Sequence, residues 1–269
     1  MTFHRDTIIG IIVLLVLLIG IVWYAAGHPM QPATPEAGGT NPAAVTGTAK
    51  GPQHLAGEGE FYTYDTQYPG STVLAETAGA DADAAAVLLM KGFEQEQIQE
   101  FSKSFQDFPA DYQESLKSEN RKGSLTMEYK TYQTDSTVSY AYTIFMDTLG
   151  AHPNGFYRTF VFNTQTGAGL TLSDLFAPGT DYLGQLSRIS RDRLPAMIAA
   201  RENVPVDQVN TDYIDSGTTP DEDNFQNFYL HDGDLAILFP PYQIGPYVLG
   251  STELDISLDD LTGLKEEYR

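Results

Sequence analysis

Alternating apolar and polar positions in the middle of the chain predict an antiparallel sheet. Within "SLTMEYKTY", Leu125, Met127 and Tyr129 alternate with polar residues, and "STVSYAYTIFM" keeps the same period of two. The segment "FYRTFVFNTQTGAGLTL" continues the alternation and contains a "TQTG" turn that suits a hairpin. Because the side chains of a strand alternate between its two faces, these segments predict about three or four successive antiparallel strands.

Strand patterns also occur closer to the two ends of the predicted folded part. Residues 58–69 contain the run of aromatics and threonines "FYTYDTQYP". Further along, "NFQNFYL" and "LAILF" flank Asp232-Gly233, a dipeptide that fits a tight hairpin turn. The segment "TELDISL" predicts a final strand with Leu254, Ile256 and Leu258 on one face.

Apolar residues at helical spacing predict a long helix over residues 81–107. Its apolar face consists of Val87, Met90, Ile98, Phe101 and Phe105. Glu94 and neighbouring Glu and Gln residues are assigned to the opposite, solvent-facing side. Phe108-Pro109 ends this helix, and a second, shorter helix is predicted around residues 111–121.

A further helix is predicted in the stretch that begins at Ser173. Its apolar face consists of Leu183, Leu186, Ile189 and Leu194. Pro195 is expected to end or kink the helix, because proline cannot donate the helical hydrogen bond. Residues 212–223 are predicted to form an acidic loop. Strands grouped apart from helices indicate an α+β fold with mainly antiparallel sheet and packed helices.

The segment "LAILFPPYQIGPYVLG" at residues 235–250 combines a buried strand with residues that interrupt strands. Its prolines and glycines cannot continue a regular ladder, yet aromatic and aliphatic residues lie between them. In one interpretation these side chains cover the end of the core, and the prolines keep a sheet edge from pairing. In the other, Tyr242 and Tyr247 form an aromatic surface for a sugar ring or a protein.

An uncharged apolar run near the start of the chain predicts a single transmembrane anchor at residues 8–26. A helix of this length is about 30 Å long, roughly the hydrocarbon thickness of a bilayer, and Trp23 and Tyr24 suit its outer interface. A cleaved signal peptide would have a shorter apolar region and a small-residue cleavage site. A lipoprotein would need a cysteine, which the chain lacks.

The composition divides the chain into five predicted segments. The anchor follows a cytoplasmic tail at 1–7 and precedes a linker at 27–57 rich in proline and glycine. An N-terminal α+β module at 58–122 and a C-terminal α+β module at 123–265 follow. This layout predicts a single-pass protein of the cell membrane, with its N-terminus in the cytoplasm and its folded part outside.

The net charge of −21 restricts the expected partners. Nucleic acid and anionic lipid would be repelled, whereas cationic proteins and metal ions would be attracted. Acidic side chains also keep an external domain soluble, so the charge has a purely structural interpretation as well. The absence of cysteine excludes disulfides, thiol catalysis and Cys-ligated zinc.

The sequence contains no recognisable catalytic motif, and no catalytic residue, cofactor or metal is predicted. His152 and Asn154 lie in the loop "LGAHPNG", where side chains are often presented to a ligand; a histidine that only bonds a nearby carbonyl is the alternative. Asn224 belongs to the oxygen-rich cluster "DEDN", which lacks the spacing of a calcium loop and is also explained as a solvated turn. His152, Asn154, Asn224, Tyr242 and Tyr247 are therefore the candidate ligand-binding residues.

Several segments in order resemble a bacterial extracellular domain of unknown function. They are "LGAHPN", "TGAGLTLSDLF", "DEDNFQNFYL", "LAILFPPYQIGPYVLG" and "ELDISLDDL". The domain is shared by RsiV-type anti-sigma factors, which sense lysozyme, and PdaC-type peptidoglycan deacetylases. The stretch "FYTYDTQYP" and the helix after it resemble the small module that usually precedes this domain.

The resemblance implies an α+β ectodomain that binds lysozyme or works beside the cell wall. The short predicted tail offers little to hold a sigma factor, and no metal-binding catalytic domain of a deacetylase is recognised. The expected function is therefore a membrane-anchored extracellular binding module, non-enzymatic, for a lysozyme-like cationic protein or a wall glycan such as peptidoglycan. An uncharacterised peptidoglycan-active hydrolase and a structural envelope component are the alternatives.

Overall fold

The computed structural model describes residues 51–269. The predicted tail at 1–7 and anchor at 8–26 lie outside these residues, as does most of the predicted linker at 27–57. The last linker residues belong to a strand, Pro52–Glu58. Between residues 51 and 269, no helix has the length and apolar character needed to span a bilayer.

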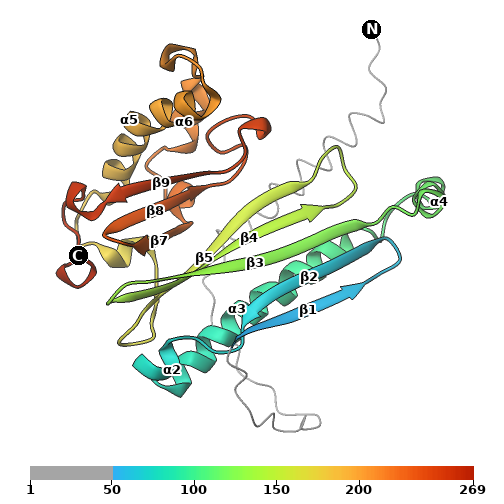
Figure 1. Cartoon of the computed structure of the whole chain (residues 1–269), viewed down its shortest axis with the longest axis horizontal. Helices are drawn as coiled ribbons and strands as arrows, with labels where there is room; N and C mark the ends of the chain where they lie inside the picture. Colours follow the sequence, from blue (N-terminus) through green and yellow to red (C-terminus); the bar gives the residue numbers. More distant parts are fainter. Residues whose placement is uncertain (1–50) are drawn as a thin grey trace. The chain divides into compact units, whose positions relative to one another are not determined.

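A six-stranded sheet forms the first half of the fold, in the order β1-β2-β3-β4-β5-β6 (Figure 1). Its strands are β1 (Pro52–Glu58), β2 (Tyr62–Pro69), β3 (Gly123–Gln133), β4 (Thr137–Asp147), β5 (Asn154–Asn163) and β6 (Gly169–Leu170). β2 and β3 pair in parallel and all other neighbours are antiparallel. The sheet thus contains strands from both predicted modules, 58–122 and 123–265.

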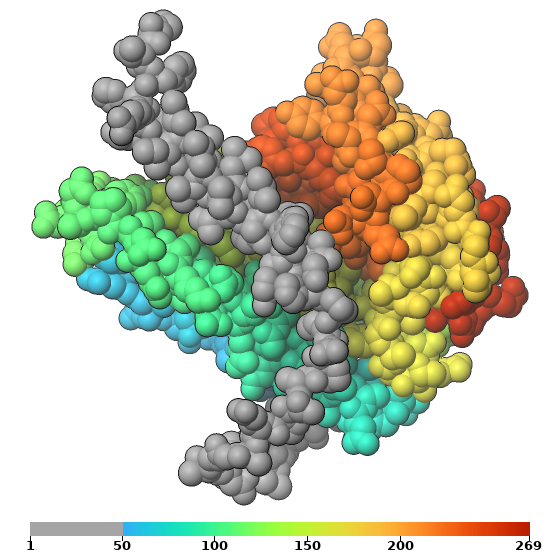
Figure 2. Space-filling model, turned by 180° about the vertical axis from the view of Figure 1, so that it is seen from behind, coloured from blue at the N-terminus to red at the C-terminus, as the bar shows by residue number. Residues whose placement is uncertain are grey.

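Helices cover one face of this sheet. α3 (Ala80–Lys103) lies along this face, preceded by the short α2 (Leu74–Thr77), while α4 (Ala110–Glu119) lies at the end of the sheet, as Figure 1 shows. Figure 2 shows α3 and α4 in teal and green on this side of the molecule. Met90 and Phe101 of α3 are buried against the alternating apolar residues of β3 and β4, as the helical spacing predicts.

Glu94 corrects the predicted polar face of α3. Its side chain is 0% exposed, although the sequence places it among other Glu and Gln residues. Glu94 lies four residues after Met90 and seven before Phe101, and positions at this spacing share one side of a helix. The prediction failed because it assigned the residue by its charge and not by its position.

A three-stranded sheet, in the order β7-β8-β9, forms the second half. Its strands are β7 (Phe228–His231), β8 (Asp234–Phe239) and β9 (Thr252–Ser257). The predicted Asp232-Gly233 hairpin is confirmed, with both residues at positive φ.

Helices α5 (Tyr182–Glu202) and α6 (Thr211–Gly217) lie on the outer side of the three-stranded sheet, as Figure 1 shows. Short 3₁₀ helices complete the chain: η1 (Leu172–Leu175), η2 (Val206–Gln208), η3 (Glu222–Phe225), η4 (Tyr247–Leu249), η5 (Leu258–Asp260) and η6 (Glu266–Tyr268).

Of the two outcomes expected at Pro195, an end of the helix does not occur, because α5 continues to Glu202 and Leu194 and Ile198 on either side of the proline are buried in the core. The acidic loop predicted at residues 212–223 is wrong for its first part, which α6 occupies. The Asn210 side chain caps α6 by accepting from the Asp212 N–H at 3.0 Å, and Ile214 of this helix is buried.

The two sheets pack against each other through a small cluster. Ala141 of β4 contacts Tyr229, Ala236 and Leu238 of the three-stranded sheet, with Tyr132 and Tyr157 at the edge of the cluster. This contact buries the second face of β4, whose residues Val138 to Tyr142 are all buried. The predicted mainly antiparallel α+β fold is confirmed for the described residues.

Candidate functional site

Three candidate residues from distant parts of the sequence meet at the surface. The Tyr242 hydroxyl lies 2.8 Å from Nε2 of His152, 90 positions away in the sequence. The Tyr247 ring stacks on the His152 imidazole, with the ring centres 4.2 Å apart and the planes 25° apart. Tyr242 and Tyr247 are 5.5 Å apart between ring centres. We call these three residues the aromatic cluster.

The loop between β4 and β5 positions His152. Leu149, with φ 62°, is buried and turns the chain, while its N–H donates to the Asp147 carboxylate at 2.8 Å. Its carbonyl accepts from the Tyr112 hydroxyl of α4 at 3.0 Å. The loop is therefore fixed at its start, and the exposed His152 projects from a supported backbone.

The connection between β8 and β9 positions the two tyrosines. The Gln243 side chain donates to the carbonyls of Gly217, at 2.8 Å, and Asn224, at 2.9 Å. Ile244 is buried in the core of the three-stranded half. Because these neighbours fix the segment, Tyr242, with φ 73°, is held outward in a backbone conformation that non-glycine residues seldom adopt.

Glycines explain much of the remaining "QIGPYVLG" pattern. A side chain at Gly245 would collide with the end of the Leu249 side chain, which would have to move to make room for it. Gly250 has φ 68° and ψ −156°, a region that is essentially restricted to glycine. The segment therefore both covers the core and presents a surface, so the two interpretations of the sequence apply together.

Hydrogen bonding defines the chemical state of the aromatic cluster. Nδ1 of His152 lies 2.9 Å from the Pro153 carbonyl, which only accepts, so the proton of a neutral imidazole belongs on Nδ1. Nε2 then accepts from the Tyr242 hydroxyl. The result is an aromatic surface held by these hydrogen bonds and extended by Val248, which is 86% exposed.

The other two candidate residues do not join the cluster through a side chain. Asn154 begins β5, opposite Met146 of β4, and is exposed. The Asn224 side chain donates to Thr219 within its own turn, and its backbone carbonyl is the one that supports Gln243. The structure therefore gives Asn224 a supporting position behind the tyrosines.

A second cluster, His231 with Glu253 and Asp255, has no counterpart in the sequence prediction. Their potential ligand atoms all lie within 4.8 Å of one another. Burial opposes a charge on His231, but hydrogen bonding and attraction from Asp255 and Asp232 outweigh it and raise the pKa of the imidazole. Two features of the sequence could have predicted this cluster. The Asp-Gly turn fixes the pairing of β7 with β8, and the alternation of "TELDISL" shows which residues of β9 share a face.

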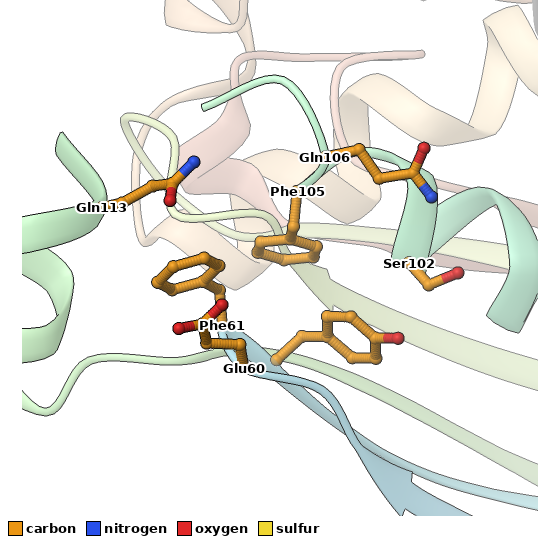
Figure 3. A pocket seen from close by; sticks show the side chains of 7 residues that line it. Glu60, Phe61, Ser102, Phe105, Gln106 and Gln113 are labelled. Atoms are coloured by element: carbon orange, nitrogen blue, oxygen red, sulfur yellow. The ribbon is translucent and has the colours of Figure 1, made fainter. Parts of the chain in front are cut away.

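A shallow pocket lies at one end of the six-stranded half. Its lining residues are Glu60, Phe61, Tyr62, Ser102, Phe105, Gln106 and Gln113. Figure 3 shows the Phe61 and Phe105 rings beside its centre, with Gln106, Gln113 and Ser102 around them. Both rings are buried in the core, so this pocket offers a ligand mainly polar groups, unlike the exposed aromatic cluster.

Comparison with known proteins identifies a domain in the second half. Residues 173–259 match the family model described as "Protein of unknown function (DUF3298)". The resemblance inferred from the sequence is thereby confirmed. Two solved structures of DUF3298 proteins share the fold at 17% identity each. The one from Bacteroides fragilis has a TM-score of 0.54 and covers 81% of this chain and 93% of its own. The one from Pseudomonas aeruginosa has a TM-score of 0.50, with coverages of 82% and 96%.

Two curated proteins are distant relatives. The peptidoglycan-N-acetylmuramic acid deacetylase PdaC of Bacillus subtilis is 24% identical over 218 residues, covering 80% of this chain and 41% of that protein. An esterase of Mycobacterium tuberculosis is 26% identical over 121 residues, covering 45% of this chain and 49% of that protein. The chain spans less than half the length of either relative, so their names alone establish no enzymatic activity for it.

Proposed function

We propose that this chain, through its DUF3298 domain and the preceding sheet, is a non-enzymatic binding module for the glycan of the bacterial cell wall. The aromatic cluster of His152, Tyr242 and Tyr247 is the observation that carries the proposal. Residues 8–26 would anchor the module at the outer face of the cell membrane, beside the wall. The deacetylase among the relatives acts on peptidoglycan by its name, which supports the choice of ligand.

The geometry of the aromatic cluster suits a sugar ring. Tyrosine presents a flat apolar face beside a polar hydroxyl, and the pyranose ring has the complementary combination of C–H groups and hydroxyls. Tyr242 is 51% exposed and Val248 86% exposed, so a ligand can reach the cluster without displacing core residues. The fixed backbone reduces the ordering cost of binding.

Co-sedimentation with purified, insoluble peptidoglycan tests the proposal. We expect the purified chain to pellet with the wall and the Tyr247→Ala variant to remain largely in solution. Tyr213→Ala is the matched control, because Tyr213 is a 40% exposed tyrosine of α6 outside the aromatic cluster. Equal pelleting of the intact chain and the Tyr247 variant would remove the cluster from the binding site.

The charge supports a second candidate, a cationic protein of the lysozyme type. A net charge of −21 attracts basic partners over long distances. Calorimetry with lysozyme at low ionic strength, repeated at about 0.5 M salt, separates the two candidates, because charge-driven binding weakens when salt screens it. Glycan stacking on an aromatic surface changes little with salt, because a neutral sugar ring is not attracted by charge.

A further inference from the structure

The small side chain of Ala236 brings His231, Asp255 and Glu253 together on one face of the three-stranded sheet. Ala236 in the central strand pairs with Tyr229 on one side and Asp255 on the other. Strands on either side of a central strand lie about 9.6 Å apart, a gap that side chains can bridge when the central residue is small. His231 of β7 pairs with Asp234, two positions from Ala236 on β8, so its side chain meets Asp255 of β9 diagonally across this face, with Nε2 and Oδ1 3.1 Å apart.

This separation matches two ligands of one metal ion. With zinc–nitrogen and zinc–oxygen bonds of about 2.0–2.1 Å, two ligands of a tetrahedral ion lie roughly 3.3 Å apart. Glu253 stands two residues before Asp255 on the same side of β9, and its carboxylate lies within 4.8 Å of both other ligand atoms. The set of one imidazole and two carboxylates leaves at least one coordination position open to solvent.

The surroundings hold these ligands in place. The Tyr229 hydroxyl donates to Oε1 of Glu253 at 2.6 Å. Its ring is buried and stacked on Tyr132, with ring centres 3.8 Å and planes 16° apart. The carboxylate of Asp232 lies 3.6 Å from Nδ1 of His231, on the side opposite Asp255. Metal-binding histidines and carboxylates are commonly oriented by such outer partners.

We propose that His231, Asp255 and Glu253 bind a divalent first-row transition-metal ion of the Zn²⁺ class. Imidazole favours zinc and similar ions over calcium and magnesium, which prefer sites made of oxygen ligands alone. The strongly acidic chain raises the local concentration of any cation. The site is separate from the aromatic cluster, so its existence does not depend on glycan binding.

Calorimetric titration of the full chain with Zn²⁺ tests this site, after dialysis against EDTA and at pH 8, where protons compete least for the ligands. We expect one strongly bound ion per chain, and an affinity at least tenfold lower in His231→Ala and in Asp255→Asn. His54→Ala is the matched control, because His54 faces Asp65 at 3.5 Å in an exposed pair outside this cluster. It should bind zinc like the intact chain.

Three further measurements keep the result interpretable. Circular dichroism without metal should show that His231→Ala is folded. Co²⁺ should give a visible absorption band in the intact chain that is missing in this variant. Ca²⁺ should bind at least tenfold more weakly than Zn²⁺. Equal zinc affinity in the intact chain and His231→Ala, or calcium binding as tight as zinc binding, would overturn the proposal in favour of non-specific attraction to an acidic surface.

Discussion

The two halves of the molecule differ in what their cores contain. Among the described residues, the core of the three-stranded half buries no charged side chain and consists mainly of leucine, isoleucine and phenylalanine from β7, β8, β9 and α5. The six-stranded half buries two acidic side chains, Asp83 and Glu94, both on α3. These two residues show that the effect of a buried carboxylate on stability depends on its hydrogen-bond partners as well as on its burial.

Asp83 and Glu94 form a natural pair for this comparison. Asp83 accepts hydrogen bonds from the Thr72 N–H at 2.5 Å, the Thr72 hydroxyl at 2.7 Å and the Ser71 hydroxyl at 3.0 Å. Neither carboxylate oxygen of Glu94 has a hydrogen-bond partner within the described part of the chain. Burial therefore raises the pKa of Glu94 to about 7, with only partial compensation from the nearby Thr66 hydroxyl.

Phe239→Ala should have the largest effect on stability. Phe239 is 0% exposed and contacts Phe225 within the apolar core, with ring centres 6.3 Å apart. Loss of a buried phenylalanine leaves a cavity that costs about 3–5 kcal/mol of unfolding free energy. Urea unfolding measures this loss, and Val248→Ala at an 86% exposed position should change it by less than about 0.5 kcal/mol.

A single shifted transition in this experiment would show that the halves unfold together, as the contact through Ala141 and Tyr229 leads us to expect. Two transitions, of which only one moves, would contradict that expectation and show that each half is stable alone.

Glu94→Gln should abolish a pH dependence of stability. The folded-state pKa of about 7 exceeds the ordinary value of 4.5, so the contribution of Glu94 is fully present below pH 4.5 and is lost as the pH rises through 7. Between pH 4.5 and 8, the unfolding free energy of the intact chain should therefore fall by roughly 3 kcal/mol relative to that of the variant. Urea unfolding at a series of pH values measures this difference.

Asp83→Asn is the matched control on the same helix. Its carboxylate is fully hydrogen-bonded, so the substitution should destabilise the fold by about 1–3 kcal/mol at pH 7. If both substitutions destabilised the fold equally at pH 8, the difference between the two carboxylates would be refuted.

Tyr242→Phe should have the smallest effect on stability of these substitutions. It tests the contact between the two halves, because Tyr242 and His152 belong to different halves. The substitution removes the hydroxyl that lies 2.8 Å from Nε2 of His152 while keeping the ring. An exposed hydrogen bond contributes about 0.5–1.5 kcal/mol, so we expect unfolding free energy to change little and glycan affinity to fall by a few-fold. Calorimetry with a soluble glycan fragment measures the affinity, and an unchanged value would show that the Tyr242 hydroxyl has no role in binding.

The sequence predicted most elements, because periodicity reports which face of a helix or strand is buried. It correctly paired β7 with β8 through Asp232-Gly233 and placed Leu254 and Ile256 inward on β9. It missed the burial of Glu94 because a charged residue is ordinarily assigned to solvent. Helix α6 was missed because its short acidic sequence is stabilised by the cap at Asn210 and the packing of Ile214.

The candidate site could be predicted only as separate parts. The loop around His152 and the segment around Tyr242 and Tyr247 each had a recognisable composition. Their approach depends on the packing of one half against the other, which no local pattern encodes. The cluster of His231, Glu253 and Asp255 was missed for a different reason: the hairpin and strand signals predict which strands pair, but β7 and β9 are neighbours only across β8, and the prediction did not combine the two pairings.

Direct titration with a soluble glycan of alternating N-acetylglucosamine and N-acetylmuramic acid tests the central claim most directly. The intact chain should bind with a measurable heat, and Tyr247→Ala should lower the affinity about tenfold, equivalent to about 1.4 kcal/mol. Tyr213→Ala should bind like the intact chain. Equal affinities of the intact chain and Tyr247→Ala, or no binding by the intact chain, would contradict the account.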